Sequence, residues 1–323
     1  MIYRRMGNSG LKLSVFSIGS WATYGGETDD RRARACLLAA YEGGVNFFDN
    51  AEAYANGKAE VIVGEVLKDL PRSALVVSSK VFWGGEGPND KGLSRKHVME
   101  ACHAALRRLQ TDYLDLYFCH RADPDTPVEE TVRAMDVLVR QGKVLYWGTS
   151  EWPAAKIREA HEVAARLGLT PPSVEQPQYN LFWRLRVEQE YAPLYKDFGM
   201  GTTTWSPLAS GVLTGKYNDE VPAGTRLSSE NYAWLQSGIT KPRIQAVRNL
   251  EPIARELGCS LAQLSLAWCA RNPHVSTVIT GASRPEQVKE NLAALAVIGK
   301  ITDEVARRID MATAKAQSTT GDD

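Results

Sequence analysis

The sequence predicts an α/β protein built as a closed (β/α)8 TIM barrel, and three observations support this fold. The 323 residues exceed the usual length of one domain, roughly 100 to 200 residues, but fit one barrel of about 250 residues with additions. Eight short apolar runs alternate with helical segments, as parallel strands and crossover helices do. The fingerprint G-x-G-x-x-G, which favours an open dinucleotide-binding sheet, is absent. We therefore expect a single barrel domain, residues 1–323, and not an open doubly wound sheet.

The first predicted element is a β-hairpin that precedes the barrel. Residues 2–6 and 11–15 are short strand-like runs. Between them, Gly7-Asn8-Ser9-Gly10 supplies residues that tolerate positive φ, as a tight turn requires. The two runs are therefore expected to pair with each other before the barrel begins.

The eight barrel strands follow as apolar runs, with helices between most of them. The strands are VFSIG near residue 15, VNFFD near 45, ALVVSSK near 74, YLDLYFCH near 113, VLYWGTS near 144, SVEQPQ near 173, GTTTW near 201 and STVITG near 276. Apolar residues at three- and four-residue steps predict helices over Asp30 to Glu42, Ser94 to Leu109, Pro127 to Gln141 and Ala154 to Leu167. Residues 208–241 predict a long, extended functional loop at the mouth of the barrel. The tail AQSTTGDD, residues 316–323, is expected to be flexible.

The composition excludes several classes of function. Lys plus Arg equals Asp plus Glu at 38 each, and no long run carries one sign, so nothing indicates nucleic acid or an anionic membrane surface as a partner. The five cysteines are scattered without CxxC spacing, which predicts free thiols and no metal site. The chain shows no signal-peptide pattern and no run near the ~18 apolar residues that span a bilayer. We therefore expect a cytoplasmic protein without membrane insertion.

Three polar residues stand at the ends of three successive apolar strands. Asp49 ends FFD, Lys80 ends VVSSK and His120 ends YFCH, and Tyr54 follows on the loop beyond the first of these strands. The carboxyl ends of barrel strands meet at one mouth, where the active sites of this fold lie. Any one of these residues could instead cap a strand or pair with a neighbour. Together they form a coherent proton-transfer set, which predicts an active site.

The four residue types suit the reduction of a carbonyl group. Negative charge builds on the carbonyl oxygen as hydride reaches the carbon, so the oxygen needs a proton donor, for which Tyr54 is the candidate. A free phenol titrates at about 10, so the ammonium of Lys80 would help by stabilising the phenolate. Asp49 would keep Lys80 charged and oriented, and a neutral His120 would donate a second hydrogen bond. A barrel aldolase with Lys80 as a Schiff-base amine is the alternative chemistry, which a charged Lys80 disfavours.

The same segments resemble a known family. FFDNAEAY, VVSSK and YFCHR are similar to the catalytic segments of the aldo-keto reductase superfamily, which implies Asp49, Tyr54, Lys80 and His120 as its tetrad. Longer phrases, among them TYGGE, KVFWGG, GLSRKH, YWGTSEW, TWSPLASGVLTGKY and GASRPEQVKEN, resemble the β-subunits of voltage-gated potassium channels and their bacterial reductase relatives. This resemblance extends from residue 3 to about residue 299. It implies NADPH as the cofactor and a homotetramer or larger homo-oligomer.

The resemblance also implies, position by position, which residues hold the cofactor. Ser150 and Gln176 would hold the nicotinamide carboxamide, and Trp21 and Asp49 would also contact the cofactor. The pyrophosphate path would consist of Trp205, Ser206, Pro207, Leu208 and Ser210, with Lys216 and Arg226 on the phosphates. The adenosine end, with its 2′-phosphate, would lie among Gly281, Ser283, Arg284, Gln287, Glu290 and Asn291.

Part of this cofactor site also follows from the residues themselves. The Gly-Ala-Ser turn at residues 281–283 opens a helix and presents backbone N–H groups to phosphate, although an ordinary helix cap would look the same. Lys216 and Arg226 could equally be solvated loop cations, but a phosphate-rich nucleotide gives such a pair a purpose. Glu27 departs from the neutral amide that the family pattern has near the cofactor.

Aromatic residues near the strand ends predict the substrate pocket. Tyr24, Trp83 and Trp152 are the candidates, and Phe82 and Tyr179 lie at similar positions. Each of them could instead belong to the packed core, which large aromatic side chains join more often. An apolar mouth of this kind would take a small-molecule carbonyl substrate.

Two functions are compatible with these observations. The first is NADPH-dependent reduction of aldehydes and ketones to alcohols, with a proton from Tyr54. The second is a nicotinamide-binding regulatory protein, similar to the channel β-subunits, with residual reductase activity. His120 favours the enzyme, because the channel subunits carry asparagine at that position and most reductases of the superfamily carry histidine.

Overall fold

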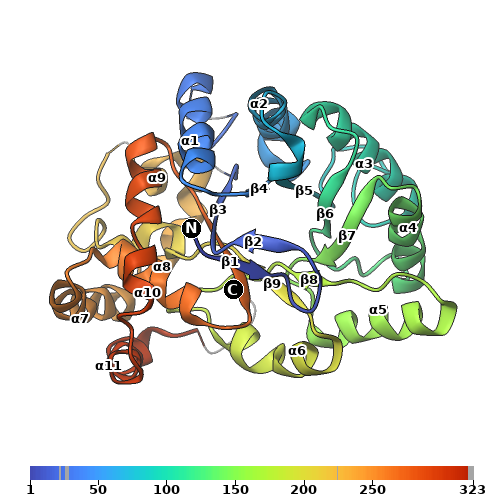
Figure 1. Ribbon diagram of the computed structural model, residues 1–323. Coiled ribbons are helices and arrows are strands. Elements are labelled where there is room, and N and C mark those ends of the chain that lie inside the picture. The colour runs from blue at the N-terminus through green and yellow to red at the C-terminus, as the bar shows by residue number, and fades with distance from the viewer. Residues whose placement is uncertain (22, 26–28, 224, 319–323) are drawn as a thin grey trace.

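Figure 1 shows the computed structural model, which describes residues 1–21, 23–25, 29–223 and 225–318. The strands of the main sheet lie where the apolar runs predicted them: β3 (Phe16–Gly19), β4 (Phe47–Asp49), β5 (Val76–Val81), β6 (Leu114–Cys119), β7 (Val144–Thr149), β8 (Val174–Glu175), β9 (Gly201–Thr204) and β10 (Val275–Thr280). Each pairs in parallel with the next along the chain, and β10 pairs with β3 to close the ring. The predicted eight-stranded barrel is therefore confirmed.

Helices surround the barrel on its outer face (Figure 1). Of the predicted helices, α1 (Asp30–Glu42) and α5 (Ala154–Leu167) begin and end where expected, while α3 (Arg95–Leu109) and α4 (Val128–Arg140) are shorter by one residue at one or both ends. Ser94 is outside α3 because it caps it, accepting the N–H of His97. The others are α2 (Lys58–Leu67), α6 (Ala192–Phe198), α7 (Lys241–Leu257), α8 (Leu261–Arg271), α9 (Pro285–Leu292), α10 (Leu295–Ile298) and α11 (Asp303–Thr313). No helix in the described ranges is long and apolar enough to span a bilayer.

The predicted hairpin forms from β1 (Tyr3–Arg5) and β2 (Lys12–Ser14), which pair antiparallel. Figure 1 shows it lying across the middle of the barrel. Gly7 in its turn has φ +54°, a conformation that favours glycine. Met6 and Leu13 are fully buried, in one cluster with apolar side chains inside the barrel. The hairpin therefore closes the amino-terminal end of the barrel, opposite the mouth formed by the carboxyl ends of the strands.

The barrel interior is apolar near the hairpin and polar near the mouth, because side chains alternate along each strand. Phe47 lies in the interior apolar cluster, and Asp49 follows it by two residues. On β5, Val76 in the same cluster is followed at two-residue steps by Ser78 and Lys80. The same step runs through Leu116, Phe118 and His120, and through Val174 and Gln176. The strand period itself thus brings polar residues to the mouth.

The sequence predicted an extended loop over residues 208–241. The segment instead contains short helices, so the prediction was wrong in this detail. The segment contains the 3-10 helices η4 (Ala209–Thr214), η5 (Arg226–Ser228) and η6 (Glu230–Gly238). The physical reason is that the segment buries apolar side chains of its own against α7 and α8, which an extended chain would expose. These side chains are Val212, Leu213, Tyr217 and Leu227.

The chain beyond α11 continues into a short 3-10 helix, η7 (Ala314–Ala316). Ala316, the first residue of the tail expected to be flexible, is buried. The N–H of Ser318 donates to the carbonyl oxygen of Phe182 at 2.7 Å. Residues 319–323 lie outside the described part of the chain.

Candidate active site

The four predicted catalytic residues lie together at the mouth of the barrel. Asp49 ends β4, Lys80 lies near the end of β5, His120 follows β6, and Tyr54 begins the 3-10 helix η1 (Tyr54–Gly57) beyond β4. The Lys80 Nζ donates to Asp49 Oδ2 at 2.7 Å and to Tyr54 Oη at 3.0 Å. The ring centre of His120 is 5.8 Å from that of Tyr54. Tyr54 thus contacts both the ammonium group and the imidazole.

The contacts of Lys80 favour an ammonium ion. Burial lowers the pKa of Lys80, and the carboxylate of Asp49 opposes this change. Besides Asp49 and Tyr54, the Nζ donates to the carbonyl oxygen of Asn50 at 2.8 Å. Asp49 Oδ2, the carbonyl oxygen of Asn50 and Tyr54 Oη surround the nitrogen, and an ammonium ion can donate one N–H to each of them. A charged amine is a poor nucleophile, so the Schiff-base chemistry of an aldolase gains no support.

Asp49 is held through both of its carboxylate oxygens. While Oδ2 accepts from Lys80, Oδ1 accepts from Ser78 Oγ at 2.8 Å and from Gln176 Nε2 at 3.0 Å. Asp49 therefore neutralises the ammonium ion and fixes its direction. Ser78 was missed in the sequence, although its position two residues before Lys80 on one strand face was a usable signal.

The backbone directly after Tyr54 is strained. Ala55 and Asn56 have φ of 49° and 52°, values that residues other than glycine seldom adopt. Such strain persists where the surrounding contacts fix the conformation, and it is concentrated at functional sites. Here the tight turn directs the Tyr54 phenol back over the strand end to Lys80.

Burial dominates the acidity of Tyr54. The pKa of Tyr54 lies well above its usual value because the phenol is buried and because the carboxylate of Asp49 is near, while Arg121 acts in the opposite direction. The sequence led us to expect that Lys80 would make the phenolate accessible, but the structure favours the protonated phenol. This is the form that a proton donor needs.

His120 is neutral at the pH of a cell. Burial lowers its pKa well below the usual value, and the positive charges of Lys80 and Arg121 add to this effect. The backbone N–H of His120 donates to the Val81 carbonyl oxygen at 3.0 Å, which anchors the residue at the strand end. Its Nδ1 is buried and has no hydrogen-bond partner among the residues that the structure describes.

A second cluster at the mouth centres on Glu151, which the sequence analysis did not single out. Its carboxylate accepts from Arg186 Nη1 at 2.7 Å, from Trp205 Nε1 at 2.9 Å and from the backbone N–H of Gln178. Glu151 therefore links the segments that follow β7, β8 and β9. Its own backbone is strained, with φ of 57°. The signal in the sequence was a charged residue directly after Ser150 at a strand end.

The residues expected to hold the nicotinamide lie beside this cluster. Ser150 Oγ donates to the carbonyl oxygen of Gln176 at 2.9 Å, and the side chain of Gln176 reaches Asp49. The indole of Trp205 meets that of Trp21 edge to face, with ring centres 6.3 Å apart. Gln176 thus connects the tetrad to the expected nicotinamide site.

The segment after β9, expected on the pyrophosphate path, has an unusual backbone. Ser206 and Ser210 have φ of 51° and 56°, and Ala209 between them also has positive φ. Residues in this conformation can turn backbone N–H groups toward a common side, as in anion-binding nests. A Cβ on Gly211 would lie 3.1 Å from the Lys216 Nζ, so this ammonium ion is close to the turn.

The residues expected around the adenosine end follow β10, the neighbour of β9 in the barrel. Asn291 Nδ2 donates to the carbonyl oxygen of Gly281 at 3.3 Å. The N–H of Ser283 donates to Gln287 Oε1 at 2.9 Å. The first turn of α9 is preceded by Arg284, whose side chain makes no capping bond. An ordinary N-cap is made by the residue that precedes the helix. Here the side chain of Gln287, within the helix, bonds to the turn instead.

The remaining expected cofactor residues are placed as follows. Pro207 and Leu208 lie in the turn before η4, and Glu290 is exposed on α9. The carbonyl oxygen of Glu290 accepts from Gln263 Nε2 at 3.1 Å. Arg226 begins η5, but its side chain, like all of Glu27, lies outside the described part of the chain.

Among the aromatic residues expected in the substrate pocket, Trp83 contacts the tetrad. Its ring centre is 4.9 Å from that of His120, and 39% of the residue is exposed. Phe82 packs edge-on against it at 4.8 Å. Tyr24 and Trp152 are only 2% exposed and pack among apolar side chains between the strands and the helices. Trp83 is therefore the best placed of the three to meet a substrate.

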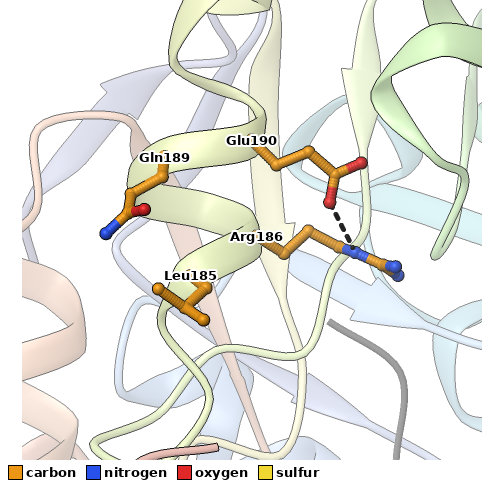
Figure 2. Close-up of a pocket in the computed structure, with 4 residues that line it drawn as sticks. All are labelled: Leu185, Arg186, Gln189 and Glu190. Carbon is orange, nitrogen blue, oxygen red and sulfur yellow. Dashed lines mark hydrogen bonds and ion pairs between the residues drawn. The ribbon is translucent and has the colours of Figure 1, made fainter. Parts of the chain in front are cut away.

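A surface hollow of about 390 Å³ lies beside the π-helix η3 (Arg186–Glu190), as Figure 2 shows. Arg186 Nε donates to Glu190 Oε2 at 3.3 Å, while its Nη1 reaches Glu151. The hollow is formed by Leu185, Arg186, Gln189 and Glu190. Within the described ranges, none of these residues forms a hydrogen bond with the tetrad. The hollow therefore shares Arg186 with the Glu151 cluster and not with the tetrad, and the candidate active site is the mouth.

Glu175 precedes Gln176 and points to the opposite side of β8, where it is fully buried. Thr149 Oγ1 donates to Oε2 of Glu175, and Tyr191 Oη lies 3.4 Å from Oε1. Burial raises the pKa of Glu175 to about 8, although the bond from Thr149 opposes this change. The carboxyl group is therefore protonated in the folded protein at neutral pH.

Glu175→Gln is expected to change how stability depends on pH. The carboxyl ionises near 4.5 in the unfolded chain and near 8 in the folded protein, so the folded state retains the proton between these values. Relative to the variant, the wild type is most stable below the lower value and loses this advantage as pH rises to the upper one. The loss is up to about 1.4 kcal/mol per pH unit. Urea unfolding of both proteins at mildly acidic and mildly alkaline pH measures it, and a constant difference would show that folded Glu175 is already ionised.

Comparisons with known proteins cover nearly the whole chain. The model described as "Aldo/keto reductase family" matches residues 16–314, which include the entire barrel and the four clustered residues. A protein of Oryza sativa subsp. japonica named "Probable voltage-gated potassium channel subunit beta" is 55% identical over 314 residues, which is 96% of each chain. A protein of Arabidopsis thaliana with the same name is 52% identical over 314 residues, again 96% of each chain.

Proposed function

The chain belongs to the aldo/keto reductase family, and from this premise we propose that it reduces aldehydes and ketones to alcohols with NADPH. The observation that carries the proposal is the position of Tyr54, whose hydroxyl lies 3.0 Å from the Lys80 Nζ and whose ring contacts neutral His120. A phenol so placed can donate a proton and can be stabilised after losing it. We propose Asp49, Tyr54, Lys80 and His120 as the catalytic residues.

The mouth has the chemistry that a dinucleotide phosphate requires. Lys216 and Arg284 follow the neighbouring strands β9 and β10, and neither forms an ion pair with any residue that the structure describes. Ser206, Ala209, Ser210 and Gly211 have the positive φ values typical of an anion-binding turn. In this proposal Ser150 and Gln176 hold the nicotinamide, the turn and Lys216 hold the pyrophosphate, and Ser283 and Arg284 hold the 2′-phosphate.

The chain's own residues perform the proton chemistry. When bound, NADPH supplies the hydride that reduces the carbonyl carbon. Tyr54 donates its proton to the carbonyl oxygen, on which negative charge builds. The Lys80 ammonium, already bonded to the Tyr54 oxygen, stabilises the resulting phenolate, and Asp49 keeps that ammonium in place. Neutral His120 donates an N–H to the same carbonyl oxygen and positions it beside the phenol.

Stopped-flow measurement of nicotinamide absorbance with a panel of aldehydes tests the proposed reaction. We expect NADPH to be oxidised at a rate that depends on the aldehyde. Fluorescence titration of NADPH in the same preparation provides the control, because it separates loss of binding from loss of chemistry. Tight NADPH binding without oxidation by any aldehyde in the panel would contradict catalysis.

The names of the two relatives support a second candidate function. A protein of this kind could bind a nicotinamide cofactor and regulate a membrane channel, with only residual reductase activity. Specific, stoichiometric association with a channel protein, together with negligible aldehyde reduction, would favour this second function. His120 beside Tyr54 favours the enzyme. For either function we propose a cytoplasmic protein that forms a homotetramer or larger homo-oligomer.

A further inference from the structure

Arg121 is a positive charge at the mouth that the proposed mechanism does not use. Its Nη1 donates to the carbonyl oxygen of His120 at 2.6 Å. Its Cζ lies over the indole of Trp83, 5.3 Å from the ring centre. The residue is partly exposed and forms no ion pair within the described part of the chain. Two neutral groups therefore position the guanidinium, and no carboxylate in the described ranges forms an ion pair with it.

Acidic residues near Arg121 are engaged with other partners. The carboxylate of Asp49 is paired with Lys80. Asp123, two residues beyond Arg121, accepts the backbone N–H of Leu93 at 2.7 Å and also bonds within its own loop. The Arg121 guanidinium therefore forms no ion pair with these carboxylates, which are bonded to other groups.

This charge lies close to the reacting groups. Burial is the main influence on the pKa values of Tyr54, Lys80 and His120, but Arg121 lowers the pKa of each of them. Such an effect falls off with distance, so the guanidinium is within electrostatic range of the place where a carbonyl group would meet Tyr54.

We propose that Arg121 binds a carboxylate or phosphate group of the substrate, so that the enzyme acts on acidic aldehydes and ketones. This inference rests on the proposed reductase function and names its substrate class. A guanidinium presents several N–H groups in one plane, which match two oxygens of an oxyanion. The bond to the His120 carbonyl and the contact with Trp83 restrict the side chain, so less conformational freedom is lost on binding.

The order of side chains at the mouth indicates the shape of this substrate. From Tyr54 to His120 to Trp83 the ring centres are 5.8 Å and 4.9 Å apart, and the Arg121 Cζ lies 5.3 Å from the ring centre of Trp83. Because Trp83 contacts both His120 and Arg121, we expect an aromatic ring or a short chain between the carbonyl and the acidic group of the substrate.

The matched substrates 4-carboxybenzaldehyde and 4-nitrobenzaldehyde test the inference, because the carboxylate and nitro groups share a shape and differ in charge. Arg121→Met removes the charge and keeps most of the side-chain length. We expect the ratio of kcat/KM for the carboxy substrate to that for the nitro substrate to fall roughly 10- to 100-fold, mainly through KM. Any effect of the lost charge on Tyr54 is common to both substrates and cancels in the ratio. Arg121→Lys should restore part of the preference.

Two further measurements keep the inference testable if Arg121→Met does not fold. On the wild type, higher ionic strength should lower kcat/KM for the carboxy substrate and leave the nitro substrate nearly unaffected. Calorimetric titration of the two product alcohols into the protein with NADP⁺ should show tighter binding of the carboxy alcohol. Glyceraldehyde 3-phosphate and glyceraldehyde repeat the comparison for phosphate, so that the preferred oxyanion is identified.

The outcomes separate this inference from the proposed function. If both aldehydes are reduced but neither Arg121→Met nor salt changes their ratio, the inference is overturned and the reductase function stands. If neither aldehyde is reduced, the reductase function fails, and the calorimetric preference decides whether Arg121 binds anions. Equal binding of the two alcohols would then reject the anion site.

Discussion

Tyr54→Phe is expected to lower turnover by roughly 10²-fold or more and to leave the affinity for NADPH nearly unchanged. The substitution removes one oxygen, which is both the proposed proton donor and the group that lies 3.0 Å from the Lys80 Nζ. The ring itself remains, with its contact to His120. Single-turnover kinetics measure the chemical step, and fluorescence titration measures the affinity.

Tyr195→Phe is the matched control for this substitution. The Tyr195 hydroxyl donates to the carbonyl oxygen of Val187 at 3.0 Å, and its ring stacks on His274 before β10, away from the mouth. Its loss should leave turnover close to that of the wild type. If Tyr54→Phe also retained wild-type turnover, another group would have to donate the proton and the proposed mechanism would be wrong.

Lys80→Met is expected to abolish measurable turnover and to lower the free energy of unfolding by about 3–5 kcal/mol. The side chain of Lys80 is wholly buried and that of Asp49 is 4% exposed, so the substitution leaves an unpaired carboxylate in the interior. Loss of the ammonium also removes the stabilisation of the Tyr54 phenolate. Urea unfolding and steady-state turnover measure the two effects.

The double variant Asp49→Asn/Lys80→Met separates the two effects of the pair. Removing both charges should restore most of the lost stability, because a buried pair is often no more stable than two neutral groups of similar size. Turnover should stay low. Lys156→Met, which breaks an exposed pair with Glu159, should change stability by no more than about 1 kcal/mol. A single variant Lys80→Met as stable as this control would mean that the interior pair has no structural role.

The barrel and the cluster at its mouth were predictable because they depend on local patterns. Strand residues alternate, so Phe47 and Asp49 had to share one face of β4, and the ends of parallel strands had to converge. Tyr54 was within reach because it lies only five residues beyond Asp49. The members of the cluster could therefore be identified from the sequence, because the ends of the strands can be located in it.

Contacts between distant segments were not predictable in the same way. Glu151 bonds to Gln178, Arg186 and Trp205, which lie 27, 35 and 54 residues away. No local pattern specifies such partners, since they depend on how three strand ends meet. The positive φ of Ala55 was equally hidden, because surrounding contacts impose it on a residue that does not favour it. The raised pKa of Tyr54 reflects burial, which a sequence does not measure.

The hairpin beneath the barrel also affects the order of events in the proposed reaction. Met6 and Leu13 fill the end of the barrel opposite the tetrad. A substrate would therefore enter, and its product leave, through the mouth at the carboxyl ends of the strands. In the proposed reaction, the alcohol product then lies between the Tyr54 phenolate and bulk solvent. Reprotonation of Tyr54 from solvent is therefore coupled to release of the alcohol. The next catalytic cycle can begin only after this release.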